Sequence, residues 1–166
     1  MKLFLSAVLL AAAAVFAAEN STATYEDYIE DAKAGDARAQ YNVALCYFKG
    51  DGVDPSLITA FDWFKKSADQ DYGNAECFMG LCYYFGKGVK QDYKKAFEYF
   101  SRAAEKDIPE AQFNLGVFYE TGKGGVTQNI EKAKEYYNKA AKQEHTKAKE
   151  AYDKLQKPRS ERSYLN

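Results

Sequence analysis

The side chains best suited to catalysis are few: the sequence has one histidine, His145, and three cysteines, Cys46, Cys77 and Cys82. A histidine-based catalytic triad needs a nucleophile and an orienting group within hydrogen-bonding reach of the ring. His145 lies in a predicted link between helices, so only distant residues could supply these groups. The sequence also lacks an HExxH motif, a CxxC pair and a phosphate-binding loop. We therefore predict no catalytic residue, no metal site and no cofactor.

The overall charge argues against nucleic acid as the partner. The chain of 166 residues has 23 Lys plus Arg and 24 Asp plus Glu, which gives a formal net charge of -1. Proteins that bind nucleic acid usually carry an excess of basic residues that pair with phosphates. The many carboxylates on predicted helices are interpreted as solvated helix faces. The length is typical of one domain that buries its own core.

The N-terminus has the pattern of a secretory signal peptide. Lys2 precedes an apolar stretch over residues 3–16, and small residues follow it. Cleavage after Ala17 would place Val15 and Ala17 at the two small-residue positions. We predict that residues 1–17 are removed and that the mature protein is periplasmic or secreted, without membrane insertion. A retained membrane anchor is the alternative, although the stretch is short for a span.

Three internal repeats organise the rest of the chain. The first block of each repeat begins at Ala39, Ala75 or Ala111 and reads AQYNVALCYFKGDGV, AECFMGLCYYFGKGV or AQFNLGVFYETGKGGV. The second block reads AFDWFKKSA, AFEYFSRAA or AKEYYNKAA, and the last offset is 37 rather than 36 residues because Gly125 is inserted. Partial matches, TYEDYIEDA and AKEAYDKL, flank the repeats. A period of this length is typical of a helical solenoid.

Each block has the periodicity of a helix, so each repeat is predicted to be an antiparallel helix pair. Favourable N-cap residues precede the second blocks: Ser56, Asp92 and Asn129. Glycines that permit tight turns separate the two blocks, and those at the second turn position are Gly52, Gly88 and Gly124. Small residues that let helices approach closely recur in the first blocks: Ala44, Gly80 and Gly116. The predicted core face of the first helices contains Val43, Tyr47, Met79, Tyr83, Leu115 and Tyr119.

The repeat pattern resembles the Sel-one-like repeat (SLR), a relative of the tetratricopeptide repeat. The shared features are A-x-x-x-L-G-x-x-Y-x-x-G-x-G-V and then K-A-x-x-Y-x-x-A-A, matched best by AQFNLGVFYETGKGGVTQNIEKAKEYYNKAA. The chain departs from the pattern at Ala44, which replaces a glycine, and at the inserted Gly125. The resemblance implies an all-α, right-handed α-solenoid of antiparallel helix pairs, with about three full repeats and capping half-repeats. It also implies an adaptor that binds a protein or peptide, and we expect a monomer.

In tetratricopeptide-like stacks the first helix of each pair lines the concave side, so variable positions on that helix are expected to face a partner. Most of them are apolar here, and a contiguous exposed apolar patch normally marks an interaction site. The alternative is that these side chains pack within and between repeats. By similarity the groove positions are Tyr41, Leu45, Phe48, Lys49, Cys77, Leu81, Tyr84, Phe85, Phe113, Val117, Glu120 and Thr121. We predict that Tyr41, Phe48, Leu81, Tyr84 and Phe113 form one connected, partly exposed surface.

A cell-wall-related hydrolase is the alternative function, because some secreted cysteine-rich SLR proteins have been described as penicillin-binding or β-lactamase-like. The sequence has neither Ser-x-x-Lys nor KTG, which serine β-lactamases use. The chemistry therefore favours a non-catalytic scaffold.

The cysteines are predicted to remain free thiols, although an oxidising compartment would permit disulfides. Cys46 and Cys82 occupy equivalent positions one repeat apart, which separates them by roughly 8 to 10 Å or more, beyond the ~7 Å Cα limit for a bridge. Cys77 lies on the same helix as Cys82 but on a different face. We expect all three to act as small apolar side chains.

The C-terminal end of the solenoid is predicted to be polar. Glu150, Asp153 and Lys154 replace the apolar and small residues of the preceding repeats, as in a capping helix. We assign residues 18–157 to the repeat domain and residues 158–166 to a disordered tail.

Overall fold

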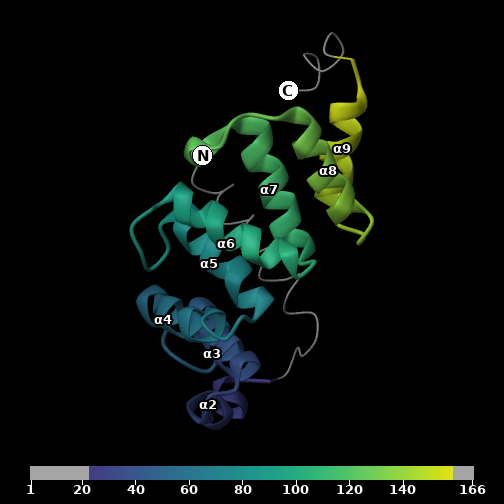
Figure 1. Ribbon diagram of the computed structural model, residues 1–166. Helices are drawn as coiled ribbons and strands as arrows, with labels where there is room; N and C mark the ends of the chain where they lie inside the picture. Colours follow the sequence, from purple (N-terminus) through teal and green to yellow (C-terminus); the bar gives the residue numbers. More distant parts are fainter. Residues whose placement is uncertain (1–22, 159–166) are drawn as a thin grey trace.

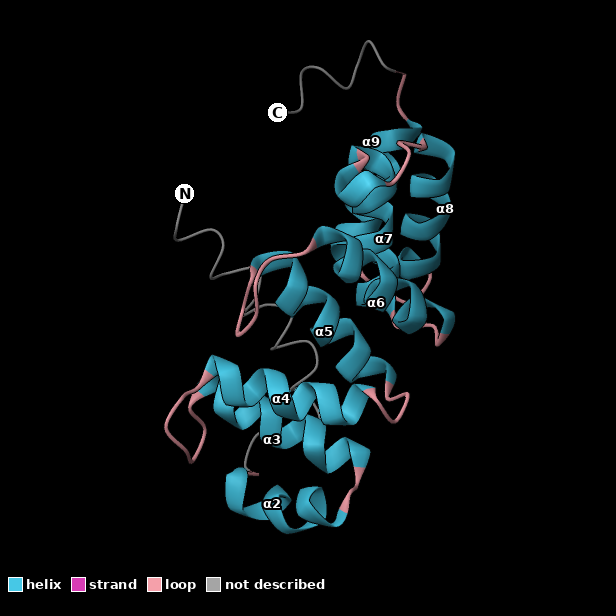
Figure 2. Cartoon of the chain, turned by 60° about the vertical axis from the view of Figure 1, so that its left-hand side comes forward, coloured by secondary structure: helices cyan, strands magenta, loops and turns pink. Residues whose placement is uncertain are grey.

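The computed structural model describes residues 23–158, in which all regular secondary structure is helical (Figure 1 and Figure 2). The signal peptide predicted for residues 1–17 lies outside the described residues, as does the predicted tail after Pro158. Within residues 23–158 no helix combines the length and apolar content needed to cross a bilayer. The helices in chain order are α2 (Tyr25–Ala34), α3 (Ala37–Lys49), α4 (Leu57–Ala68), α5 (Gly73–Phe85), α6 (Tyr93–Glu105), α7 (Pro109–Thr121), the short 3-10 helix η1 (Lys123–Gly125), α8 (Ile130–Ala141) and α9 (Thr146–Gln156).

The α-helices stack in sequence order from α2 at one end of the molecule to α9 at the other (Figure 1). The closest packing lies within the pairs α3 and α4, α5 and α6, and α7 and α8, and each pair packs on the next through α4 with α5 and α6 with α7. Helices α2 and α9 pack on the outer pairs as half-repeats. The predicted all-α solenoid of helix pairs is confirmed.

The ends of the helices follow from local sequence. The side chains of Ser56, Asp92 and Asn129 accept hydrogen bonds from backbone N–H groups three residues later, at 3.2, 3.1 and 3.0 Å, so each caps the start of a second helix. Pro109 occupies the first turn of α7, where its missing N–H costs nothing. These caps fix where α4, α6 and α8 begin.

Glycines bring the two helices of a repeat into close contact. A Cβ atom on Gly80 would lie 2.6 Å from the Phe100 ring, and one on Gly116 would lie 2.5 Å from the Tyr137 ring. Ala44 is fully buried at the equivalent position of the first repeat. At Gly80 and Gly116 even the Cβ atom of an alanine would therefore collide with the facing ring of the second helix.

The turn glycines connect one repeat to the previous one. Gly88 and Gly124 have positive φ angles of 70° and 68°, and a Cβ atom on either would collide with backbone at Leu57 or Tyr93, where the preceding second helix begins. Gly52 packs less closely, with its Cβ position 3.4 Å from Thr24. Each turn thus rests on the start of the helix before it.

A polar pair with one buried and one exposed partner recurs in each repeat and joins the start of the first helix to the residues after the second. Gln70 donates to Gln40 at 2.8 Å, and Gln143 donates to Gln112 at 2.9 Å. The middle repeat instead has the fully buried carboxylate of Glu76, which accepts from Lys106 Nζ at 2.7 Å. An amide pair in the outer repeats is therefore replaced by an ion pair in the middle repeat.

Candidate binding surface

Two tyrosine rings and two cations form a partly exposed cluster in the middle repeat. Tyr83 of α5 stacks on Tyr99 of α6, with ring centroids 5.6 Å apart and an interplanar angle of 15°. Lys95 Nζ lies 5.2 Å from the Tyr83 ring centroid, and the Arg102 guanidinium carbon lies 5.5 Å from the Tyr99 ring centroid. Both rings are half-buried. We call these four residues the central cluster.

The next repeat has the same arrangement at equivalent positions. Tyr119 of α7 stacks on Tyr136 of α8, with centroids 5.6 Å apart and an angle of 7°. Lys132 and Lys139 lie over these rings, each with its Nζ 5.2 Å from a ring centroid. We call these four residues the C-terminal cluster. The geometry is thus repeated, and it does not depend on one chance contact.

Helical spacing positions the cations and rings of both clusters. Lys95, Tyr99 and Arg102 follow one another at intervals of four and three residues along α6, and such residues share one helix face. Lys132, Tyr136 and Lys139 have the same spacing in α8. The stacked tyrosine comes from the last turn of the preceding helix. Each cluster therefore needs both helices of its repeat.

A phenylalanine links each cluster to the previous repeat. The Phe61 ring packs edge-on against Tyr83 at 5.6 Å, and the Phe97 ring packs edge-on against Tyr119 at 5.8 Å. The first repeat has a reduced version of the cluster, in which Lys66 Nζ lies 4.0 Å from the centroid of Trp63. Aromatic side chains therefore continue along this side of the solenoid.

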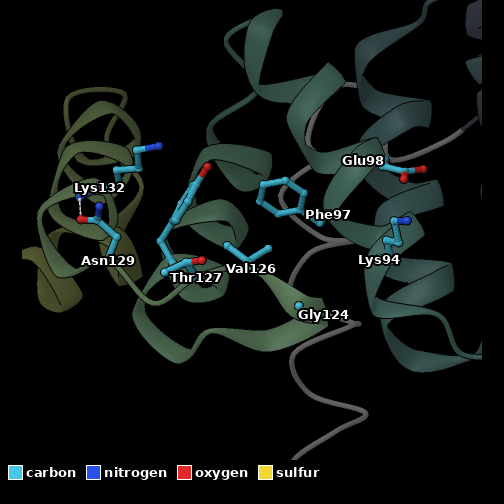
Figure 3. Close-up of a pocket in the computed structure, with 10 residues that line it drawn as sticks. Lys94, Phe97, Glu98, Gly124, Val126, Thr127, Asn129 and Lys132 are labelled. Carbon is cyan, nitrogen blue, oxygen red and sulfur yellow. Dashed lines mark hydrogen bonds between the residues drawn. The ribbon is translucent and has the colours of Figure 1, made fainter.

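Two hollows open beside the clusters. A hollow of about 260 Å³ is lined by Tyr83, Lys95, Glu98, Tyr99 and Arg102. A larger hollow of about 550 Å³ lies between α6 and the connection from α7 to α8, and it includes Phe97, Tyr119 and Lys132. Figure 3 shows Phe97 and Val126 between Lys94 and Glu98 on one side and Asn129 and Lys132 on the other. The inserted Gly125 lines this second hollow, so the longer connection contributes directly to its wall.

The groove predicted along the first helices is wrong for four of its residues. Tyr41, Leu45, Cys77 and Leu81 are buried, so they cannot line an open surface. The physical reason is clearest in α5, where every residue from 75 to 82 is buried because α4, α6 and α7 all pack against this helix. Of the five residues predicted to form one connected surface, Tyr41 and Leu81 are buried, whereas Phe48, Tyr84 and Phe113 are half-buried.

Three of the other predicted groove residues contact the next repeat or half-repeat through their rings. Phe48 packs edge-on against Phe78 at 6.2 Å, and Tyr84 packs edge-on against Phe118 at 5.8 Å. Phe113 stacks on His145 at 4.9 Å. Phe85 and Val117 are half-buried, whereas Lys49 and Thr121 are exposed. The Glu120 carboxylate accepts a hydrogen bond from the Tyr137 hydroxyl at 2.6 Å. Partner binding by these residues stays a prediction.

The sequence analysis missed the exposed edge of the clusters because it placed Tyr47, Tyr83 and Tyr119 on the core face. All three are half-buried. A signal was present in the aligned second blocks, where a basic residue recurs at positions 95 and 132 and again at positions 102 and 139. Recurrence of tyrosine and cation together would have indicated this surface.

The residues that could support catalysis have structural roles or are buried. His145 accepts a hydrogen bond from the Ala148 N–H through Nδ1 at 3.1 Å, and its Nε2 lies 2.8 Å from a Glu110 carboxylate oxygen. Cys46, Cys77 and Cys82 are free and buried, and burial raises the pKa of the Cys82 thiol to about 12. Within residues 23–158 no group of three acidic, histidine or cysteine side chains is placed to hold a metal ion.

Comparison with known sequences identifies the repeat. The Sel1 repeat family, which is the SLR of the sequence analysis, matches residues 37–72, 73–108 and 109–145. These bounds coincide with the three helix pairs. No curated protein matches the chain at a significant level.

Similar solved structures include two repeat proteins with more than 30% identity. The crystal structure of c5321, a protective antigen present in uropathogenic Escherichia coli strains displaying an SLR fold, is 38% identical with a TM-score of 0.69 over 74% of this chain and 26% of that chain. A Sel1 repeat protein from Oxalobacter formigenes is 34% identical with a TM-score of 0.70 over 75% of this chain and 49% of that chain. The chain therefore spans about a quarter and about half of these two relatives.

A third structure supports the fold alone. Cysteine rich protein B (hcpB) of Helicobacter pylori is 23% identical with a TM-score of 0.60 over 78% of this chain and 97% of that chain. The three family matches cover well over half of the chain and agree with its helix pairs. The chain belongs to the Sel1 repeat family.

Proposed function

We propose that this protein is an exported, monomeric scaffold that binds a segment of another protein along the central and C-terminal clusters. Sel1 repeat proteins are generally protein-interaction scaffolds, and this supports the class of function. The structure adds a candidate surface, which differs from the groove expected by similarity.

One observation carries the proposal: the same stacked tyrosine pair with its two cations occurs in two successive repeats. Half-buried tyrosines offer a large apolar contact area and a hydroxyl, and they lose little conformational entropy on binding. Two equivalent clusters, one repeat apart, can hold two points of one partner segment. Such repetition suits an extended ligand better than a small molecule.

Export is supported by the N-terminal sequence. Lys2, the apolar residues 3–16 and the small residues around Ala17 form the pattern that signal peptidases recognise. The proposal expects the mature protein to begin at Ala18. Mass spectrometry of the protein recovered from the periplasm or medium of an expressing bacterium tests this, and a mass that retains residues 1–17 would contradict it.

The binding surface is tested with a random 12-residue peptide library displayed on phage. Peptides selected on the wild-type protein are expected to lose affinity for a Tyr83→Ala, Tyr119→Ala double variant by about 5-fold to 1,000-fold, since truncation of a central aromatic anchor costs about 1 to 4 kcal/mol. Tyr152→Ala in α9 is the matched control, because this half-buried tyrosine lies outside both clusters. Circular dichroism checks that each variant is folded. Equal affinity for the double variant and the wild type would refute this surface.

A further inference from the structure

Three lysines beside the hollows have no acidic partner among the described residues. Lys95 lines the smaller hollow, and Lys94 and Lys132 line the larger one. None of the three forms a salt bridge within residues 23–158, whereas their neighbours Lys134 and Lys139 pair with Glu131 and Glu135 at 3.1 and 2.8 Å. The exposed ammonium groups of the three lysines are therefore available to a ligand.

The local charge differs from that of the whole chain. Basic and acidic residues are nearly balanced overall, at 23 and 24. The two hollows together are lined by Lys94, Lys95, Lys132 and Arg102, and the one carboxylate among their lining residues is that of Glu98. Arg102 is already paired with the buried Glu76 at 2.7 Å. This leaves three lysines and one carboxylate to meet a ligand, which is a net positive surface.

Two of these lysines are positioned by the repeat itself. Lys95 and Lys132 occupy equivalent positions, and each lies 5.2 Å from the centroid of the equivalent tyrosine, Tyr83 or Tyr119. A carboxylate beside such a lysine would form a charge-assisted hydrogen bond, while the ring would contact the apolar part of the same segment. The pairing of cation and ring thus favours a ligand that has both anionic and apolar groups.

We propose that the partner segment is acidic, with Asp or Glu side chains that pair with Lys95 and Lys132 while neighbouring apolar side chains contact the tyrosines. This inference rests on the proposed function and names the chemistry of its partner. Complementary charge raises the rate of encounter and selects between partners. A neutral or basic segment would leave the three lysines without a counter-charge.

The experiment compares two variants that remove the same charge. Lys95→Gln with Lys132→Gln removes the two equivalent cluster lysines, and Lys147→Gln with Lys149→Gln removes two exposed lysines of α9. Peptides are selected from the random 12-residue library on the wild-type protein at about 50 mM salt, where surface charges are weakly screened. Their affinities for both variants are measured by fluorescence anisotropy, and for the wild type also at about 500 mM salt.

The selected peptides are expected to be enriched in Asp and Glu over the starting library. The cluster variant should bind them at least about 10-fold more weakly than the wild type, and the α9 variant should bind within about 2-fold of it. The affinity of the wild type should fall at high salt, and that of the cluster variant should fall less.

The possible results distinguish a failure of this inference from a failure of the proposed function. Peptides that need Tyr83 and Tyr119 but are not acidic, or that bind both lysine variants equally, would overturn the acidic partner and leave the scaffold proposal standing. An absence of any peptide that depends on the tyrosines would overturn both. Binding of heparin through Lys95 and Lys132, with no acidic peptide selected, would replace the protein segment with an acidic polysaccharide and so also overturn the inference.

Discussion

At Gly80 the absence of a side chain allows the Phe100 ring to lie against the α5 backbone, where a Cβ atom would be 2.6 Å from it. Gly80→Leu should destabilise the protein by about 1 to 3 kcal/mol, because the larger side chain forces the ring and the α6 backbone to move. The free energy of unfolding from urea denaturation measures this. Asp153→Leu adds the same side chain at an exposed position of α9 and should change stability by less than about 0.5 kcal/mol. Similar values for the two variants would contradict the close contact.

The burial of the three cysteines leads to a second prediction, which concerns the reactivity of their thiols. Burial raises the pKa of the Cys82 thiol to about 12 and raises that of Cys77 well above its usual value, so few reactive thiolates form at pH 8. The folded protein should react slowly with Ellman's reagent, whereas the denatured, non-reduced protein should show close to three thiols per chain. A value near one thiol after denaturation would show that two cysteines form a disulfide.

At the level of the helices, a polar pair joins the start of the first helix of each repeat to the residues after its second helix. The ion pair of the middle repeat should be replaceable by the amide pair of the outer repeats. Glu76→Gln alone should cost about 1 to 3 kcal/mol, because Lys106 loses the buried carboxylate that accepts its hydrogen bond and Arg102 loses its ion-pair partner. Adding Lys106→Gln should restore part of the lost stability, because it creates the amide pair that is present in the outer repeats at 2.8 and 2.9 Å. A double-mutant cycle by urea denaturation should give a favourable coupling of at least about 0.5 kcal/mol. Strictly additive effects would contradict the equivalence of the three pairs.

The elements themselves were predictable from sequence because their signals are local. The caps at Ser56, Asp92 and Asn129 and the 36-residue period indicate where helices begin and how they pair. The exposed side of the first helices was not predictable in the same way. In α5 apolar and small residues surround the helix almost completely, so periodicity cannot distinguish the side that faces a neighbouring repeat from the side that faces solvent. Tyr83 and Tyr84 are adjacent in sequence and both half-buried, yet they belong to different packing environments.

The polar pairs show a second limit of the sequence. Glu76 looks like a solvated helix residue, but it is fully buried because Lys106 and Arg102 approach it from the end of α6. Contacts between residues 26 and 30 positions apart depend on how two helices are set against each other. Only the comparison of equivalent positions 40, 76 and 112 across repeats would have indicated the pairing.

At the scale of the whole molecule, the repeat copies one binding element along the solenoid. The cluster around Tyr83 is formed by α5 and α6, and the cluster around Tyr119 is formed by α7 and α8. Phe97 of α6 packs against Tyr119 and so links the two repeats. The inserted Gly125 lines the hollow beside the C-terminal cluster. We therefore predict one continuous binding surface over two repeats and not a site within a single repeat.

The most direct test is an NMR titration of the ¹⁵N-labelled protein with a peptide selected from the random library. The account predicts that the largest chemical-shift changes fall on the residues of both clusters, among them Lys95 and Tyr99 of α6 and Lys132 and Tyr136 of α8. Small changes are expected around Phe48 and Phe113, which lie at contacts between helices. Changes centred on Phe48, Phe85 and Phe113, with the clusters unaffected, would contradict binding at the clusters and favour the groove along the first helices.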